Sequence, residues 1–252
     1  MHKLFPSKNN VHYLSSKQDQ FEAAYIAVRE KEGRVLSDEE VQTLPYLHQQ
    51  HPKHQEWKRR VSSTKKILDD VAKKRPERIL DLGCGNGWFT YLLAQKSRGQ
   101  LIGTDINVVE LEQAARLFTS DNCHFIYGDI FSNQWPIAYF DRITLNACVQ
   151  YFPDLNQLLN RLLQLLKPNG EVHFIDSPFY KETEIHAAKE RTATYYEQQG
   201  VTEMTSFYHH HAWAILDNFN YKIRYQPQAF FNKMSNLIFK NTSPFPWIVI
   251  TK

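Results

Sequence analysis

The sequence of 252 residues has few cysteines, no long apolar run and little net charge. Its three cysteines, Cys84, Cys123 and Cys148, include no C-x-x-C pair, so neither a disulfide framework nor a zinc site is expected, and no other metal is predicted. Because no apolar run approaches about 18 residues and the N-terminus has no apolar segment, we expect a cytoplasmic protein without a membrane partner. A formal net charge of +3 does not indicate a nucleic-acid partner.

The most informative segment is residues 79–90, Ile-Leu-Asp-Leu-Gly-Cys-Gly-Asn-Gly-Trp-Phe-Thr. An apolar run ends near Asp81, and an apolar helical pattern begins at Trp88. Between them lie three alternating glycines, Gly83, Gly85 and Gly87. The pattern predicts a strand, a glycine loop and the start of a helix. Such a loop brings backbone N–H groups and a helix N-terminus close to a bound ligand.

The spacing of this loop discriminates between ligands. A dinucleotide fingerprint, G-x-G-x-x-G, needs its third glycine at position 88, where this chain has Trp88. A phosphate-binding Walker loop is excluded because no Gly-Lys-Ser/Thr follows. The carboxylate of Asp81 repels a pyrophosphate but attracts an ammonium group. The expected ligand therefore has a cationic end and a nucleoside, and S-adenosylmethionine has both.

Strand and helix patterns alternate through much of the chain. The predicted strands are 79–82, 100–105, 124–127, 140–145, 171–176, 221–225 and 247–251. The predicted helices are 21–29, 54–74, 88–96, 108–118, 155–166, 181–199 and 207–219, with a further helix start at a capping box of Ser37 and Glu40. This alternation predicts a parallel sheet with helices on both faces and a ligand at the carboxyl ends of the strands.

Residues 79–90 resemble motif I of the class I S-adenosylmethionine-dependent methyltransferases, and the topology of residues 54–252 is similar to theirs. The resemblance implies an α/β fold: a three-layer Rossmann-like sandwich with a mostly parallel seven-stranded sheet whose last strand is antiparallel. Residues 1–53 would then form a helical N-terminal extension or cap, similar to that of a bacterial subset whose substrate is unassigned. A substrate-side insertion is expected at about 177–219. Whether the extension is a lid is left open, with Tyr25, Trp57 and Arg60 as lid candidates.

The resemblance also implies roles for residues that follow the strands. Asp105 would accept hydrogen bonds from the ribose, although a strand-end Asp is also a common helix cap. Ile106 and Ile130 would flank the adenine, Asp129 would bind its amine, and Asn146 would lie near the methionine part. Together with the loop, the expected cofactor residues are Asp81, Gly83, Cys84, Gly85, Gly87, Asp105, Ile106, Asp129, Ile130 and Asn146. The product would be S-adenosylhomocysteine.

The catalytic group is not evident from the sequence. Methyl transfer from a sulfonium is an in-line displacement that depends mainly on positioning, and a general base helps when the nucleophile carries a proton. The candidates are His209, His210 and Tyr151. A small-molecule acceptor is the leading hypothesis. An aminopropyltransferase-like enzyme and a non-catalytic S-adenosylmethionine-binding protein are the alternatives, and the acceptor atom and oligomeric state stay open.

Overall fold

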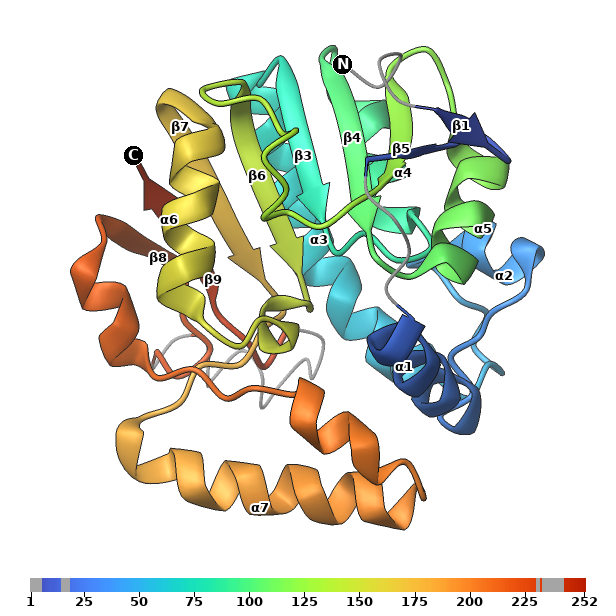
Figure 1. Cartoon of the computed structure of the whole chain (residues 1–252), viewed down its shortest axis with the longest axis vertical. Coiled ribbons are helices and arrows are strands. Elements are labelled where there is room, and N and C mark those ends of the chain that lie inside the picture. The colour runs from blue at the N-terminus through green and yellow to red at the C-terminus, as the bar shows by residue number, and fades with distance from the viewer. Residues whose placement is uncertain (1–5, 15–18, 230–231, 233–242) are drawn as a thin grey trace.

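The computed structural model describes residues 6–14, 19–229, 232 and 243–252. Within these ranges the strands form a nine-stranded sheet in the order β1-β2-β5-β4-β3-β6-β7-β9-β8 (Figure 1). No helix in the described part is long and apolar enough to cross a membrane.

The element bounds are close to those predicted for the central part of the chain. The strands are β1 Ser7–Lys8, β2 Val11–Tyr13, β3 Arg78–Leu82, β4 Gln100–Asp105, β5 Cys123–Tyr127, β6 Phe140–Asn146, β7 Leu166–Ile175, β8 Tyr221–Tyr225 and β9 Trp247–Thr251. The α-helices are α1 Asp19–Lys31, α2 Asp38–Thr43, α3 His54–Lys74, α4 Trp88–Lys96, α5 Val108–Phe118, α6 Leu155–Leu165 and α7 Glu182–Gln198. Short 3₁₀ helices are η2 Val149–Tyr151, η3 Thr202–Phe207 and η4 Trp213–Asn218. The predicted capping box of Ser37 and Glu40 begins α2.

The sheet is mostly parallel, as expected. The six strands β2, β5, β4, β3, β6 and β7 run parallel to one another, β1 is antiparallel to β2, and β9 is antiparallel to both β7 and β8. The expected count of seven strands is wrong, because β1 and β2 extend the edge beside β5. These two strands span only two and three residues, too few to show a period in the sequence. The N-terminal extension is therefore not purely helical.

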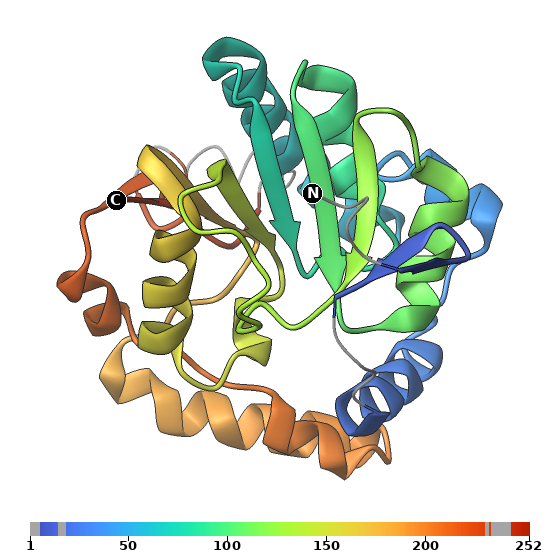
Figure 2. The same cartoon turned by 45° about the horizontal axis from the view of Figure 1, so that its top comes forward.

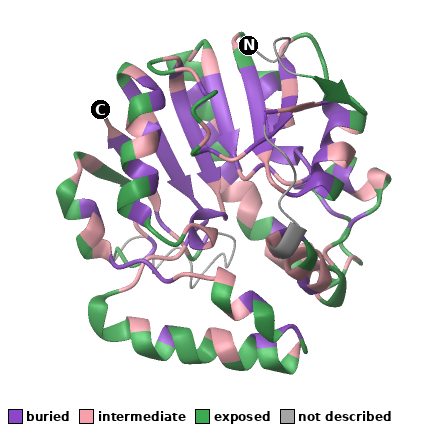
Figure 3. Cartoon of the chain, viewed as in Figure 1, coloured by how far each residue is buried: buried purple, intermediate pink, exposed green. Residues whose placement is uncertain are grey.

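Helices cover both faces of the sheet, and the strands between them are buried (Figures 2 and 3). The apolar side chains of α3, α4 and α5 pack on one face, and those of α6 and η4 pack on the other. Successive residues of β3 illustrate the division, since Ile79 belongs to the first cluster and Leu80 to the second. Both are fully buried. The result is a three-layer sandwich.

Two local predictions are wrong. Residues 208–212, between η3 and η4, are not helical, where a continuous helix over 207–219 was expected. Tyr180 explains the difference, because its N–H donates to the carbonyl of His211 and its carbonyl accepts from the N–H of Trp213. The strand β7 begins at Leu166 and includes residues 168–170, where a turn was expected. These backbone pairings join distant segments, so local propensity does not show them.

Helices α1 and α7 lie beyond the carboxyl ends of the parallel strands (Figures 1 and 2). They are joined where their C-terminal ends meet, since Lys31 Nζ donates to the Gly200 carbonyl at 3.2 Å and Tyr195 donates to Glu32. The ring of Phe21 packs edge-on against Phe207 of η3 at 5.5 Å between centroids. The fold thus places a cap of N- and C-terminal segments over the edge of the sheet where a ligand is expected.

Candidate active site

The glycine loop connects the end of β3 to the start of α4, as the sequence predicts. Gly83, Gly85 and Gly87 have φ angles of 72°, 51° and 74°, in the left-handed region that glycine adopts without steric cost. A Cβ at Gly83 would lie 2.6 Å from the Cβ of Cys148, so the loop can pass close to the segment after β6 only with glycine there. The loop conformation therefore depends on these glycines.

Asp105 holds this loop against the end of β4. Its Oδ2 accepts a hydrogen bond from the N–H of Gly85 at 2.8 Å, and its Oδ1 accepts from those of Ile106 and Asn107 at 2.8 and 2.9 Å. Burial and the nearby charge of Glu110 raise the pKa of Asp105 to about 6, although these N–H groups act in the opposite direction. The three N–H groups thus hold the carboxylate in place, while burial makes its ionisation unfavourable in free energy without a ligand.

Asp81 lies beneath the same loop. Its two oxygens accept hydrogen bonds from the hydroxyls of Thr90 at 2.6 Å and Thr144 at 2.8 Å. Burial nevertheless raises its pKa to about 6. Each carboxylate oxygen has a second lone pair, so both can accept a further donor. A cationic ligand would favour the ionised form of both Asp81 and Asp105.

A cavity of about 840 Å³ adjoins the loop. It is lined by Asp81, Gly83, Cys84, Gly85, Asp105, Ile106, Asp129, Ile130 and Asn146, which are all of the predicted cofactor residues except Gly87. A Cβ at Gly87 would instead lie 2.7 Å from Ala114 and 2.8 Å from the ring of Phe125. The structure thus gives Gly87 a packing position between the loop, α5 and β5.

Asn146 offers the cavity a buried polar atom that can bind a ligand. Its Oδ1 is buried and has no hydrogen-bond partner among the described residues, and the same is true of Oε1 of Gln150, which also lines the cavity. A buried acceptor without a partner is rare, because it loses its bonds to water and gains none. Both atoms fit a ligand with N–H or O–H donors, such as the ammonium of S-adenosylmethionine. The residues present therefore fit the expected cofactor.

The three catalytic candidates differ in position. Tyr151 lines the cavity, and burial raises its pKa to about 12, so it stays protonated at neutral pH. Neither His209 nor His210 is among the lining residues. The ring of His210 instead bonds the hydroxyl of Thr192 at 2.9 Å, and the N–H of His209 donates to a backbone carbonyl. Both histidines therefore contact residues that line the cavity, Thr192 and Gln150, and do not line it themselves.

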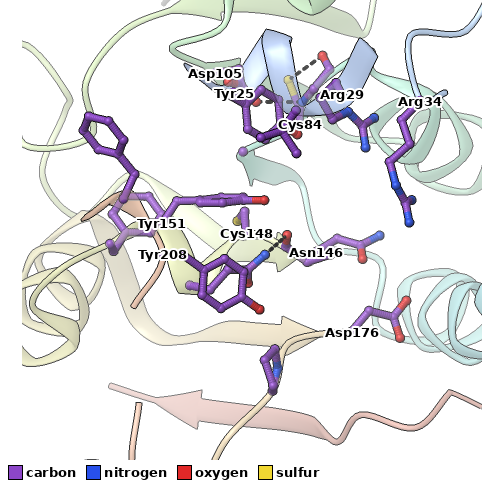
Figure 4. Close-up of a pocket in the computed structure, with 18 of the residues that line it drawn as sticks. Tyr25, Arg29, Arg34, Cys84, Asp105, Asn146, Cys148, Tyr151, Asp176 and Tyr208 are labelled. Carbon is purple, nitrogen blue, oxygen red and sulfur yellow. Dashed lines mark hydrogen bonds between the residues drawn. The ribbon is translucent and has the colours of Figure 1, made fainter. Parts of the chain in front are cut away.

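Besides the lid candidates Tyr25 and Arg60, the cap supplies lining residues to which the sequence gave no role. Arg29 and Arg34 reach toward the centre of the cavity from the α1 side, facing Asn146 and Asp176 (Figure 4). Tyr25 and Arg29 lie one turn apart on α1, and Glu32 follows directly after the helix; this i, i+4, i+7 spacing was a usable signal that they share one side. The other lining residues from the cap and the C-terminal segments include Glu56, Arg59, Arg60, Tyr180, Arg191, Thr192, Tyr195 and Tyr208.

Among the lid candidates, Tyr25 and Arg60 line the cavity, and Trp57 does not. Trp57 is buried and packs edge-on against Trp88 at 5.1 Å between centroids. Trp88 follows the glycine loop directly, so this contact joins α3 to the start of α4. Trp57 thus packs behind the loop.

A second group of titratable residues lies elsewhere. Asp70, Glu171 and His173 have potential ligand atoms within 4.8 Å of one another. Arg142 donates to Asp70 at 2.6 Å and to Glu171 at 3.3 Å, and Lys74 contacts Glu171 at 2.6 Å. Burial lowers the pKa of His173 to about 4. The carboxylates of this group are thus neutralised by cations of the chain itself.

Comparison with known proteins places the chain in a family. A family model described as a methyltransferase domain matches residues 73–228. The malonyl-[acyl-carrier protein] O-methyltransferase of Acetivibrio thermocellus is 33% identical over 125 residues, which cover 49% of this chain and 44% of that protein. The trans-aconitate 2-methyltransferase of Escherichia coli is 33% identical over 105 residues, 41% of this chain and 40% of that protein. The matches thus cover less than half of the length of these relatives.

Solved structures show the same fold at low sequence identity. A putative S-adenosylmethionine-dependent methyltransferase from Methanococcus maripaludis has a TM-score of 0.52 at 16% identity and covers 95% of this chain and 97% of its own. The CurJ carbon methyltransferase has a TM-score of 0.57 at 17% identity and covers 91% and 67%. The match to the family model spans more than half of the chain and contains the glycine loop. The chain therefore belongs to the methyltransferase domain family, and its fold is that of these solved methyltransferases.

Proposed function

We propose that this enzyme transfers the methyl group of S-adenosylmethionine to a small-molecule acceptor. The observation that carries the proposal is the cap over the cavity, in which α1 and α7 are joined through Lys31, Glu32 and Tyr195. A wall closed on this side favours a small acceptor over a polymer. The name of one relative, the trans-aconitate 2-methyltransferase, also indicates a small acceptor for that protein.

The proposal gives the cofactor residues distinct tasks. Asp81 and the unpartnered Oδ1 of Asn146 would accept from the ammonium group, and Asp105 would accept from the ribose hydroxyls. Ile106 and Ile130 would flank the adenine, and Asp129 would accept from its amine. S-adenosylmethionine would supply a methyl group bonded to a positively charged sulfur, and this charge makes the thioether S-adenosylhomocysteine a good leaving group.

The chain itself would contribute mainly position and the exclusion of water. Burial keeps Tyr151 protonated, so this residue would donate a hydrogen bond to the acceptor and not remove a proton from it. His209 and His210 do not line the cavity, which gives them no direct role in this proposal. We therefore expect rate acceleration chiefly from alignment of the acceptor with the methyl group.

Calorimetry tests the cofactor part of the proposal. Asp105→Ala should weaken binding of S-adenosylhomocysteine by about 1–3 kcal/mol, because hydrogen bonds to a charged acceptor are lost. Asp121→Ala is the matched control, since Asp121 is exposed and lies before β5 at the amino ends of the strands. Unchanged affinity in Asp105→Ala would contradict the assigned role of Asp105.

The acceptor requires a separate experiment. The intact protein is incubated with methyl-labelled S-adenosylmethionine and a cell extract, and the extract is then fractionated by size. Label in small molecules supports the proposal. Label confined to protein or nucleic acid contradicts it, and absence of transfer by protein that binds the cofactor would indicate a non-catalytic binding protein.

A further inference from the structure

The part of the cavity formed by the cap is rich in arginine. Arg34 follows α1, Arg59 and Arg60 lie on α3, and Arg191 lies on α7, and all four line the cavity. The predicted cofactor residues come from the glycine loop and the ends of the strands, and they include the carboxylates of Asp81, Asp105 and Asp129. The cavity therefore has an acidic part at the sheet and an arginine-rich part at the cap.

The carboxylates among these arginines already have partners. Glu56 accepts two hydrogen bonds from Arg34, at 2.6 and 2.8 Å, and lies 3.4 Å from Arg60. Glu32 pairs with Arg34 at 2.8 Å and accepts from Tyr195. Glu32 and Glu56 are thus already paired with cations of the cap, Arg34 and Arg60.

Asp176, at the carboxyl end of β7, is hydrogen-bonded by two serines and by no arginine in the described part of the chain. It accepts from the hydroxyl of Ser63 at 2.9 Å and from that of Ser243 at 2.6 Å, one on each carboxylate oxygen. No ion pair joins it to an arginine among the described residues. Asp176 therefore does not neutralise the arginines of the cap.

Arg59 and Arg191 differ from Arg34 and Arg60, because neither forms an ion pair or a side-chain hydrogen bond with any described residue. Both side chains are exposed to the cavity and to solvent. A guanidinium group has five N–H donors in a planar fork that matches the two oxygens of a carboxylate or phosphate. Two such groups on a ligand cavity have unused capacity for an anion.

The cavity has room for an acceptor beside the cofactor. Pockets that hold one small ligand have volumes of about 300–1,000 Å³, and this cavity of about 840 Å³ lies in the upper part of that range. The single carboxylate of S-adenosylmethionine does not require four arginines. Arg191 also lies next to Thr192 on α7, in the segment after β7 that contributes no predicted cofactor residue.

We propose that the acceptor carries an oxyanion group, a carboxylate or a phosphate, and that Arg59 and Arg191 bind it. The inference deepens the proposed function and rests on it. Charge-assisted, bidentate hydrogen bonds from arginine orient an anion as well as hold it. They would fix the acceptor on the cap side while the methyl group faces it from the sheet side. Arg34 and Arg60 would keep the surrounding wall in place through Glu56.

Calorimetry on protein saturated with S-adenosylhomocysteine tests this inference. Succinate, citrate and inorganic phosphate are the anionic probes, and succinamide is the neutral counterpart of succinate. At least one anion should bind saturably, and succinamide should not. Comparison of the two carboxylic acids with phosphate identifies the kind of oxyanion. Arg59→Gln and Arg191→Gln should each weaken the anion about tenfold or more, because a charged donor is lost.

Arg98→Gln is the matched control. Arg98 is an exposed arginine between α4 and β4, at the amino end of the strand, and does not line the cavity. All three variants should bind S-adenosylhomocysteine as the unmodified protein does, which shows that they are folded.

Three results would overturn the inference. They are no binding of any of the three anions, equal binding by all variants, and anion binding that occurs only when S-adenosylhomocysteine is absent. The last would assign the arginines to the carboxylate of the cofactor. None of these results depends on the labelled-methyl screen, so failure of this inference can be told apart from failure of the proposed function.

Discussion

At the scale of single residues, Asp81 and Asp105 combine burial with a role at the ligand site. Burial raises the pKa of both to about 6. A neighbouring negative charge acts in the same direction, that of Asp105 on Asp81 and that of Glu110 on Asp105. Because these pKa values are higher in the folded protein than in the unfolded chain, the folded state binds more protons between about pH 4 and pH 6. The two protonated carboxyl groups therefore contribute stability to the ligand-free protein at low pH, and this contribution is lost as the pH rises through 6.

A cationic cofactor should reverse this dependence. We expect the affinity for S-adenosylmethionine to rise from pH 5 to pH 7 and then level off, with proton release on binding near pH 6, because the ligand favours the ionised carboxylates. Calorimetry in two buffers of different ionisation enthalpy measures both quantities. Asp105→Asn should reduce the proton release. An affinity that does not change between pH 5 and pH 7 would contradict the assignment.

Two glycines with similar backbone angles allow a second test at this scale. Gly33→Ala should cost about 1–2 kcal/mol from the left-handed conformation alone, since its φ is 62° and nothing lies within 4 Å of the added Cβ. Gly87→Ala should cost about 1–3 kcal/mol more, because the Cβ would overlap Ala114 and Phe125. Denaturant unfolding measures the difference. Equal losses would show that the loop can shift and that packing at Gly87 is not critical.

At the scale of elements, α1 is tied to the start of α5. Glu22 on α1 accepts from the N–H of Val108 at 2.6 Å, and Arg29 pairs with the largely buried Glu110 at 3.0 Å. The start of α5 follows Asp105 directly, so these contacts hold the cap helix next to the expected ribose position. The docking of α1 and the binding of the cofactor should therefore be coupled.

Arg29→Met tests the coupling. It leaves Glu110 without its cation, so we expect a loss of about 1–3 kcal/mol in docking of α1, faster hydrogen exchange over residues 19–31 and faster release of S-adenosylhomocysteine. Arg116→Met is the control, because the pair of Arg116 with Asp38 is more exposed, and solvent screening leaves such a pair with little effect on stability. Exchange that is the same in both variants would show that α1 docks without the Arg29 pair.

At the scale of the whole molecule, ligand binding should appear as global stabilisation. S-adenosylhomocysteine at about 100 times its Kd adds about 2.7 kcal/mol, which corresponds to about 5–10 °C in Tm for a chain of this size. NAD and ATP should give no comparable shift, because Trp88 replaces the third glycine of a dinucleotide loop and no Gly-Lys-Ser/Thr is present. Thermal unfolding followed by fluorescence measures these shifts. A shift of equal size with NAD would contradict the ligand discrimination.

The predictions succeeded where the chain has long periodic segments. The helices over 54–74 and 108–118 were predicted with the bounds that α3 and α5 have, because apolar residues recur on one face through several turns. The strands β1 and β2 were missed, since their short segments depend on pairing with β5. The helix over 207–219 was wrong because residues 211–213 pair with Tyr180.

The sequence by itself determined the fold class and the family of the protein, and it predicts the cofactor. The glycine loop and the acidic residues at the ends of successive strands act over short stretches, so their chemistry can be recognised without knowing what lies opposite. Only the tertiary structure decided which residues lie opposite the expected cofactor site. Arg34, Arg59 and Arg191 are far apart in the chain, and they meet on one cavity because α1, α3 and α7 converge beyond the sheet. Contacts of this kind arise from packing between elements, for which a single sequence carries no local pattern.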